Sequence, residues 1–194
     1  MNPDFLANIS YTTVANMRIK IFSKCAFTKV AFSYLEGMNY GNESISVIDI
    51  EHGIDTILLH RVINDETIKF VIILNNRNHS PLLIANKVIL ISKRSPIRTF
   101  KKIIFTISIF KEITGYEVFL SSKEKIFFDC WLQGIPIKSI AKNMAITHKT
   151  ANNMRNGIHR KYGIKDLFTF LLIVEITHIH NTEKFCVLNQ RFHG

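Results

Sequence analysis

The first half of the chain alternates between short apolar segments typical of strands and segments with helical periodicity. Strands are predicted at 18–22, 45–50, 68–74 and 88–91, and helices at 27–35, at 54–63 and after Pro96. The segment between Ser80 and Val88 is predicted as a short helix or loop. Because repeated strand-helix units fold into a parallel sheet flanked by helices, the first half is predicted to be an α/β domain.

The second half has helical periodicity and contains no convincing strand. Ser121 and Glu124 have the spacing of a capping box, which starts a helix that ends at Gly134. A short helix is predicted at 138–144, and Thr147 is the expected N-cap of a third helix. The third helix stops before Gly163, and Asp166 can cap a fourth, so this half is predicted to be an all-α four-helix domain.

These patterns divide the chain into an α/β domain at 1–112, a linker at 113–119, a helical domain at 120–180 and a tail at 181–194. The tail is expected to be disordered by default. The fourth helix is apolar almost all round and therefore needs cover on more than one side. Another protomer could supply some of that cover.

Positive charge is concentrated in the helical domain. The formal net charge is +10. Between residues 120 and 165, nine Lys or Arg face two acidic residues, which is an excess of seven positive charges. A basic patch of this size attracts polyanions such as nucleic acid or an acidic membrane surface.

Several function classes find no support in the sequence. No carboxylate pair, Ser/His/Asp set, Gly-rich phosphate loop or metal-ligand cluster has usable spacing, so we expect neither an enzyme nor a cofactor or metal site. The three cysteines lie far apart and are expected to be reduced thiols. No signal peptide and no segment long enough to span a membrane is evident, so a cytoplasmic location is expected.

The third predicted helix carries one polar stripe. Advancing 100° per residue places four polar residues within about 60° of Lys149: Asn152, Asn153, Asn156 and Arg160. Ala151, Met154 and Ile158 fall on the opposite side. An Asn side chain can bond adenine N6 and N7 together, and Arg or Lys can bond guanine O6 and N7, so this stripe suits a major groove. An isolated basic helix is more often a solvated face, but the preceding short helix, tight turn and threonine cap favour DNA reading.

Hydroxyl and ammonium groups near the helix starts are placed for backbone phosphates, which add affinity without reading sequence. Thr147, Thr150 and Lys138 are the predicted phosphate contacts. His148 and His159 are expected to be solvated.

The segment LSSKEKIFFDCWLQGIPIKSIAKNMAITHKTANNMRNGIHRKYGI resembles the LuxR-type helix-turn-helix. About 55 residues are covered, and the resemblance implies DNA binding as a dimer through the fourth helix. It also adds Arg155 and Lys161 to the predicted DNA-binding residues. Ala151, Asn152, Met154 and Leu167 depart from the residues usual in that family.

The α/β half resembles the receiver domain of response regulators, shortened by one strand-helix unit between Gly37 and Glu43. Asp49 stands at the phospho-acceptor position and Lys93 at that of the receiver's lysine, but Ser23-Lys24 replaces the acidic pair. Asn75 stands where receivers have threonine or serine. One aspartate without its partners binds Mg²⁺ poorly, so Asp49 is predicted to be a vestigial acceptor that is not phosphorylated to any regulatory extent.

The segments IFSKCAFTKVAFSYL and VILISKRSPIRTFKKI resemble the degenerate receivers of the RcsA and BglJ group, auxiliary LuxR-type regulators that act without phosphorylation, often paired with a full response regulator. The sequence therefore predicts a transcription regulator that binds double-stranded promoter DNA as a homodimer or as a heterodimer with a response regulator. One alternative is a protein that sequesters another regulator without binding DNA well. A second alternative is a small-molecule sensor that uses the α/β half as its pocket.

Overall fold

The structure, a computed structural model, describes residues 18–36, 44–84, 87–110, 115–116, 118–179 and 185–188. Four parallel strands form the main part of one sheet: β1 (Arg18–Phe22), β2 (Ser44–Asp49), β3 (Phe70–Asn75) and β5 (Val88–Ser92). β3 and β5 are buried along their whole length, which explains why they read as continuous apolar runs. The predicted strands are confirmed to within two residues at each end.

The parallel strands lie in the order β1-β2-β3-β5. This is the order of a flavodoxin-like sheet without its outermost strand. Residues 37–43, between α1 (Ala26–Glu36) and β2, are too few to hold another strand and crossover helix, which need a dozen residues or more. The predicted shortening by one strand-helix unit is therefore confirmed by the strand order.

Three short antiparallel strands extend the sheet beyond β5, and none of them was expected. They are β4 (Leu82–Ile84), β7 (Phe185–Leu188) and β6 (Gly115–Tyr116), in the order β4-β7-β6. The prediction of a loop or short helix before Val88 was wrong for β4. The prediction of a disordered tail was wrong for residues 185–188, and the second half does contain a strand.

The helical half consists of four helices with the predicted caps: α4 (Ser122–Leu132), α5 (Ile137–Asn143), α6 (His148–Tyr162) and α7 (Leu167–Ile179). The capping box is present, with the Ser121 N–H donating to Glu124 Oε2 at 2.8 Å and the Glu124 N–H donating to Ser121 Oγ at 3.4 Å. Asp166 accepts from the Thr169 N–H at 2.9 Å and so caps α7. Gly163 ends α6 in the left-handed conformation, with φ 66°. The α/β-plus-helical fold class is confirmed.

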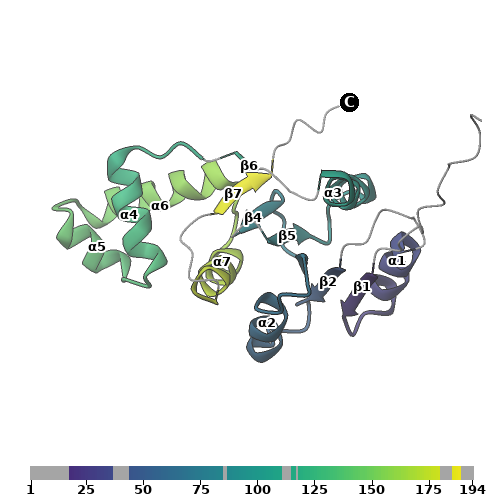
Figure 1. The fold of residues 1–194 in the computed structure, drawn as a ribbon. Coiled ribbons are helices and arrows are strands. Elements are labelled where there is room, and N and C mark those ends of the chain that lie inside the picture. Colours follow the sequence, from purple (N-terminus) through teal and green to yellow (C-terminus); the bar gives the residue numbers. More distant parts are fainter. Residues whose placement is uncertain are drawn as a thin grey trace, which may run out of the picture.

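Two apolar cores lie on the two faces of the sheet. α1 and α3 (Ile97–Phe110) cover one face, where Phe32 of α1 and Ile103 of α3 are buried. α2 (Thr56–Ile63) and α7 lie on the other face (Figure 1), and that core continues without a break into the interior of the four-helix bundle. Phe170 and Ile173 of α7 are fully buried within it.

The cover for α7 therefore comes from this chain itself. α7 contacts α2 and β4, and the expectation that another protomer covers part of it is not needed for these buried residues. Leu167 and Leu171 remain more than half exposed. In the part of the chain that the structure describes, no helix has both the length and the apolar composition needed to cross a membrane.

β7 is predicted to stabilise the sheet edge that β4 would otherwise expose. Val187 pairs with Leu82 on one side and with Tyr116 on the other, and proline at this position removes the backbone N–H. We expect Val187→Pro to accelerate hydrogen exchange at the β4 amides while leaving the central β2–β3 amides protected. Equal β4 protection in the variant and the wild type would show that β7 contributes nothing to this edge.

Candidate nucleic-acid interface

α5, a short turn and α6 form a helix-turn-helix. The turn closes through the Ile146 N–H, which donates to the Ala141 carbonyl at 3.0 Å. Ala145 has φ 52°, a left-handed conformation that costs a non-glycine residue about 1 kcal/mol and is held here by the packed helices on both sides. The Thr147 hydroxyl accepts from the Thr150 N–H at 3.1 Å, which confirms Thr147 as the N-cap of α6.

The apolar side of α6 fixes which side faces solvent. Ala151 and Ile158 are fully buried against the bundle, and Tyr162 stacks on Phe128 with ring centroids 5.4 Å apart. Since these residues lie on one side of the helix, the opposite side is turned outward. Four of the five residues in the polar stripe that the sequence predicts are exposed on that side, namely Lys149, Asn153, Asn156 and Arg160, whereas Asn152 is partly buried.

Three other residues of α6 have partners within the chain. The Asn152 amide donates to the His148 carbonyl at 3.0 Å and so lies along its own helix. The Arg155 guanidinium bonds Asn156 Oδ1 at 3.3 Å. Lys161 donates to Glu124 Oε2 at 2.7 Å and to the Phe119 carbonyl, so its ammonium joins the end of α6 to the start of α4. The role of all three at DNA stays a prediction.

The predicted phosphate contacts are exposed at the start of α5 and α6. Lys138 lies in the first turn of α5. Thr147 and Thr150 hydrogen bond to each other through their hydroxyls at 2.9 Å. Each hydroxyl keeps a free lone pair or proton for a further partner. Lys149 is exposed between them, so the N-terminal end of α6 presents a cation and two hydroxyls together.

A cavity of about 610 Å³ lies beside the C-terminal half of the stripe. Its lining consists of Asn153, Asn156, His159, Arg160, Ile164 and Lys165. The sequence did not single out Lys165, because it falls in the loop after Gly163, outside the helical stripe. The fold brings it beside Arg160, so the polar surface extends beyond α6 itself.

His159 is half-buried, which corrects the expectation that it is solvated. Its ring lies 5.0 Å from Trp131 of α4 and 5.8 Å from Phe170 of α7, measured between centroids. Burial, followed by the nearby Arg155 charge, lowers the pKa of His159 below its ordinary value. The neutral ring therefore serves as a packing residue that anchors α6 to its neighbours. His148 is exposed, as predicted.

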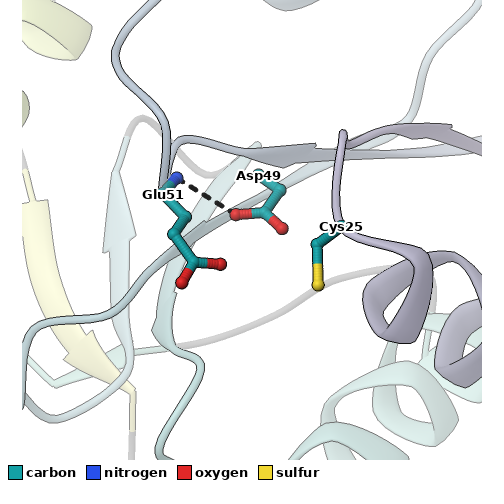
Figure 2. Close-up of side chains that lie close together, drawn as sticks. All are labelled: Cys25, Asp49 and Glu51. Carbon is teal, nitrogen blue, oxygen red and sulfur yellow. Dashed lines mark hydrogen bonds between the residues drawn. The ribbon is translucent and has the colours of Figure 1, made fainter.

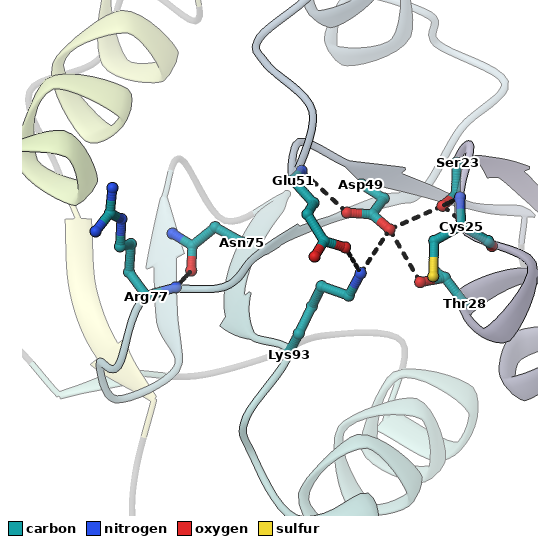
Figure 3. Close-up of polar contacts among 8 residues, drawn as sticks. All are labelled: Ser23, Cys25, Thr28, Asp49, Glu51, Asn75, Arg77 and Lys93. Atoms are coloured by element: carbon teal, nitrogen blue, oxygen red, sulfur yellow. Dashed lines mark hydrogen bonds and ion pairs between the residues drawn. The ribbon is translucent and has the colours of Figure 1, made fainter.

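A second polar cluster lies at the carboxyl end of the parallel strands, around Asp49. Asp49 Oδ2 accepts from Ser23 Oγ at 2.8 Å, from Thr28 Oγ1 at 2.9 Å and from Lys93 Nζ at 3.0 Å (Figure 3). Asp49 Oδ1 accepts from the Glu51 N–H at 3.1 Å. The Asp49 side chain is only 1% exposed. Both carboxylate oxygens are thus already bonded within the chain.

The cluster keeps Asp49 ionised. Burial opposes ionisation, but the hydrogen bonds from Ser23, Lys93 and the Glu51 backbone outweigh it and hold the pKa of Asp49 below its ordinary value. Burial opposes ionisation of Lys93 as well, but its bonds to the Glu51 and Asp49 carboxylates outweigh that effect and raise the pKa of Lys93. Asn75 takes no part, because its Oδ1 accepts instead from the Arg77 N–H at 3.1 Å and pairs with the buried His79 ring at 2.9 Å.

Asp49 also belongs to a group of possible metal ligands. Cys25, Asp49 and Glu51 each place one ligand atom within 4.8 Å of the others (Figure 2). The Lys93 ammonium, however, bonds both carboxylates. A divalent cation would have to break the bonds of the Lys93 ammonium to these carboxylates, and the ammonium, held close by its backbone, would then repel it. We therefore assign no metal to the cluster. Among the described cysteines, Cys25 and Cys130 are free thiols.

The chain matches no family model and no curated protein. Among solved structures it is similar to RcsB from Salmonella enterica serovar Typhimurium bound to promoter rprA with a phosphomimetic, at 13% identity and a TM-score of 0.43, over 78% of this chain and 98% of that one. A structure of two RcsB dimers on two parallel DNAs gives 11% identity and a TM-score of 0.39, over 87% and 100%. Full-length FixJ from B. japonicum gives 11% and 0.28, over 86% and 97%. These similarities are distant, so function is argued below from this chain's own residues.

The Asp49 cluster generates a stability prediction. Removing the carboxylate in Asp49→Ala takes the shared acceptor away from the Ser23 and Thr28 hydroxyls and leaves Lys93 with Glu51 alone, and we expect a loss of about 1–3 kcal/mol in the free energy of unfolding. Because the folded pKa of Asp49 is lowered, its contribution is fully present above the unfolded pKa of about 3.9 and is lost as pH falls through the folded pKa. Urea unfolding at pH 7 and at acid pH measures both effects.

The matched control is Glu51→Gln, which removes a carboxylate that also bonds Lys93 but lies at the surface. We expect it to cost less than about 1 kcal/mol. Equal losses in the two variants would contradict the central role of Asp49 in the cluster.

Proposed function

We propose that this protein is a sequence-specific DNA-binding transcription regulator of the LuxR type, in which α6 reads the major groove. The observation that carries the proposal is the exposed stripe of Lys149, Asn153, Asn156 and Arg160 on a helix that follows a capped tight turn. Its side chains are those that recognise base edges in pairs of hydrogen bonds, and an α-helix fits the major groove.

The residues around α6 support separate roles at DNA, with phosphate contacts beside the helix and base contacts on its stripe. Lys138, Thr147 and Thr150 lie where backbone phosphates would pass the starts of α5 and α6. Lys165 continues the polar surface at the other end. Each phosphate contact adds affinity that falls with salt, whereas each bidentate base contact adds about 1–3 kcal/mol of discrimination.

We further propose that regulation does not depend on phosphorylation of Asp49. Phosphoryl transfer to an aspartate needs a carboxylate oxygen that is open to the donor and a bound Mg²⁺ to offset the phosphate charge. Here Asp49 is buried and its oxygens are engaged by four donors. The Lys93 ammonium bonds the Asp49 and Glu51 carboxylates and so occupies the place where Mg²⁺ would have to bind.

A buried, fully bonded Asp49 next to a basic DNA-reading helix favours a place in the RcsA and BglJ group, whose members act without phosphorylation and often pair with a full response regulator. The burial of α7 on the sheet of its own chain supports this placement, because it covers much of the apolar surface through which α7 could otherwise bind a second copy of the chain. Leu167 and Leu171 are the exposed apolar residues through which α7 can still meet another protomer. We propose that the active species on DNA is a dimer, either of this chain or with a response regulator.

DNA reading is tested by selecting bound duplexes from a random pool at about 150 mM salt, where counterion-driven non-specific binding is weakened. We expect an enriched motif. Asn153→Ala should lose preference at one base pair by about 1–3 kcal/mol, or roughly 5- to 150-fold, without loss of stability because Asn153 is exposed.

Lys125→Ala is the matched control, since Lys125 is an exposed residue of α4 outside the proposed interface. It should leave the selected motif unchanged. A folded protein that enriches no motif would overturn autonomous DNA reading and favour the sequestering alternative. A motif that Asn153→Ala and Lys149→Ala leave intact would overturn the assigned reading face.

Phosphorylation independence is tested with a small-molecule phosphodonor such as acetyl phosphate and Mg²⁺. We expect no phosphoryl group on the intact protein by mass spectrometry and no change in affinity for the selected duplex. Incorporation that disappears in Asp49→Asn, accompanied by a change in DNA affinity, would contradict the proposal.

A further inference from the structure

α1 exposes an unusual row of large apolar side chains. Phe27 is 87% exposed, and Val30 and Tyr34 are each 68% exposed. These residues lie at positions i, i+3 and i+7, with the exposed Ala31 at i+4, so they form one stripe along the helix. Single exposed apolar residues need no explanation, but a contiguous stripe of this kind marks an interaction site.

The stripe borders a groove between α1 and α3. The groove has a volume of about 300 Å³, and Phe27, Ala31 and Ile97 lie along it. Phe32 and Phe100 pack edge to face below, with centroids 6.0 Å apart, and join the two helices rigidly. Ile97 is 57% exposed. Thr28, Lys93 and Ser95 also line the groove, so it combines an apolar floor and exposed apolar walls with three polar residues.

Positive charge dominates the chain segments that build this surface, and the one acidic residue of α1 is Glu36, at its end. Residues 23–34 and 94–107 contain six Lys or Arg and no Asp or Glu. Lys24, Lys29, Arg98 and Lys101 are exposed. The nearby Lys93 is neutralised by Asp49 and Glu51. An apolar groove bordered by cations complements an apolar surface bordered by carboxylates.

The same charges argue against a second copy of this chain in the groove. A symmetric pair brings the same patch of both chains together, so the exposed cations Lys24, Lys29, Arg98 and Lys101 of one chain would face those of the other. Such like-charge contact opposes association, most strongly at low salt. A partner of opposite rim charge gains from the same field.

We propose that the surface formed by α1 and α3 is a docking site for a partner protein that presents an apolar helix bordered by Asp and Glu. The site lies on the face of the sheet opposite α7. It is also separate from the stripe on α6, so the proposal goes beyond DNA binding and does not depend on it.

The experiment uses the full chain and two synthetic helical peptides with the same leucine stripe. One peptide carries glutamates at the flanking positions and the other carries lysines. Fluorescence anisotropy should show that the glutamate peptide binds at least about tenfold more tightly, with an affinity that falls as salt rises. Val30→Asp should weaken that binding by at least about tenfold, because it places a charge in the apolar stripe.

Tyr34→Ser gives a second, uncharged disruption of the stripe and should produce a loss in the same direction. Ile57→Asp is the matched control, since Ile57 is an 81% exposed apolar residue of α2, which packs on the other face of the sheet. It should bind the glutamate peptide as the wild type does. Affinity of Val30→Asp for the selected duplex should be unchanged, so a failure here is distinct from a failure of the DNA-reading proposal.

Two results would overturn the docking proposal. The first is equal binding of the two peptides, or glutamate-peptide binding that survives both α1 substitutions. The second is self-association of the wild-type chain in sedimentation velocity that Val30→Asp abolishes, which would show that a second copy occupies the groove.

Discussion

The need to cover α7 shapes the whole molecule. This helix is apolar on nearly every side, and its buried residues pack both on the four-helix bundle and on the α/β half. The sheet and α2 provide the cover in the α/β half, so the two halves share one apolar core. β6 and β7 add a second connection, because the segments that enter and leave the helical half pair with each other at the edge of the sheet. The helical half is therefore held at both of its ends.

One side of α6 takes no part in this packing. Its packing residues Ala151 and Ile158 face the bundle, and the anchors at its C-terminal end are the Lys161–Glu124 ion pair and the His159 ring. Gly163, which ends α6, lies so close to Ser80 that a Cβ there would come within 2.8 Å of the Ser80 hydroxyl. The C-terminal end of the helix is thus fixed by the α/β half, while the polar stripe stays exposed.

Periodicity was enough to predict most of the helices and parallel strands, because these elements bury one face or two and their apolar positions repeat accordingly. The caps Ser121, Thr147 and Asp166 could be predicted equally well, since capping depends on hydrogen bonds between residues close in sequence. β4 and β7 were missed because a strand of three or four residues has no measurable period and depends on distant pairing partners. Lys165 and His159 were missed or misassigned for the same reason: tertiary packing, which spacing does not encode, places them beside the stripe.

The position of Asp49 beside Lys93 was implied by the receiver resemblance, but its engagement by Ser23 and Thr28 was not. Those hydroxyls bond the carboxylate where receiver domains have acidic neighbours, so the cluster is an internal ion pair supported by two hydroxyl hydrogen bonds. It joins β1, α1, β2 and β5 at the edge of the sheet that bears the exposed α1 stripe. The cluster thereby links four elements of the α/β half through one carboxylate.

DNA reading by α6 is tested by NMR of the nitrogen-15-labelled chain with its selected duplex. We expect the side-chain amide signals of Asn153 and Asn156 to shift on binding, together with backbone amides from Thr147 to Arg160. The signals of α1 and α3 should stay in place. Unshifted Asn153 and Asn156 signals at saturating duplex, with shifts concentrated elsewhere, would contradict it.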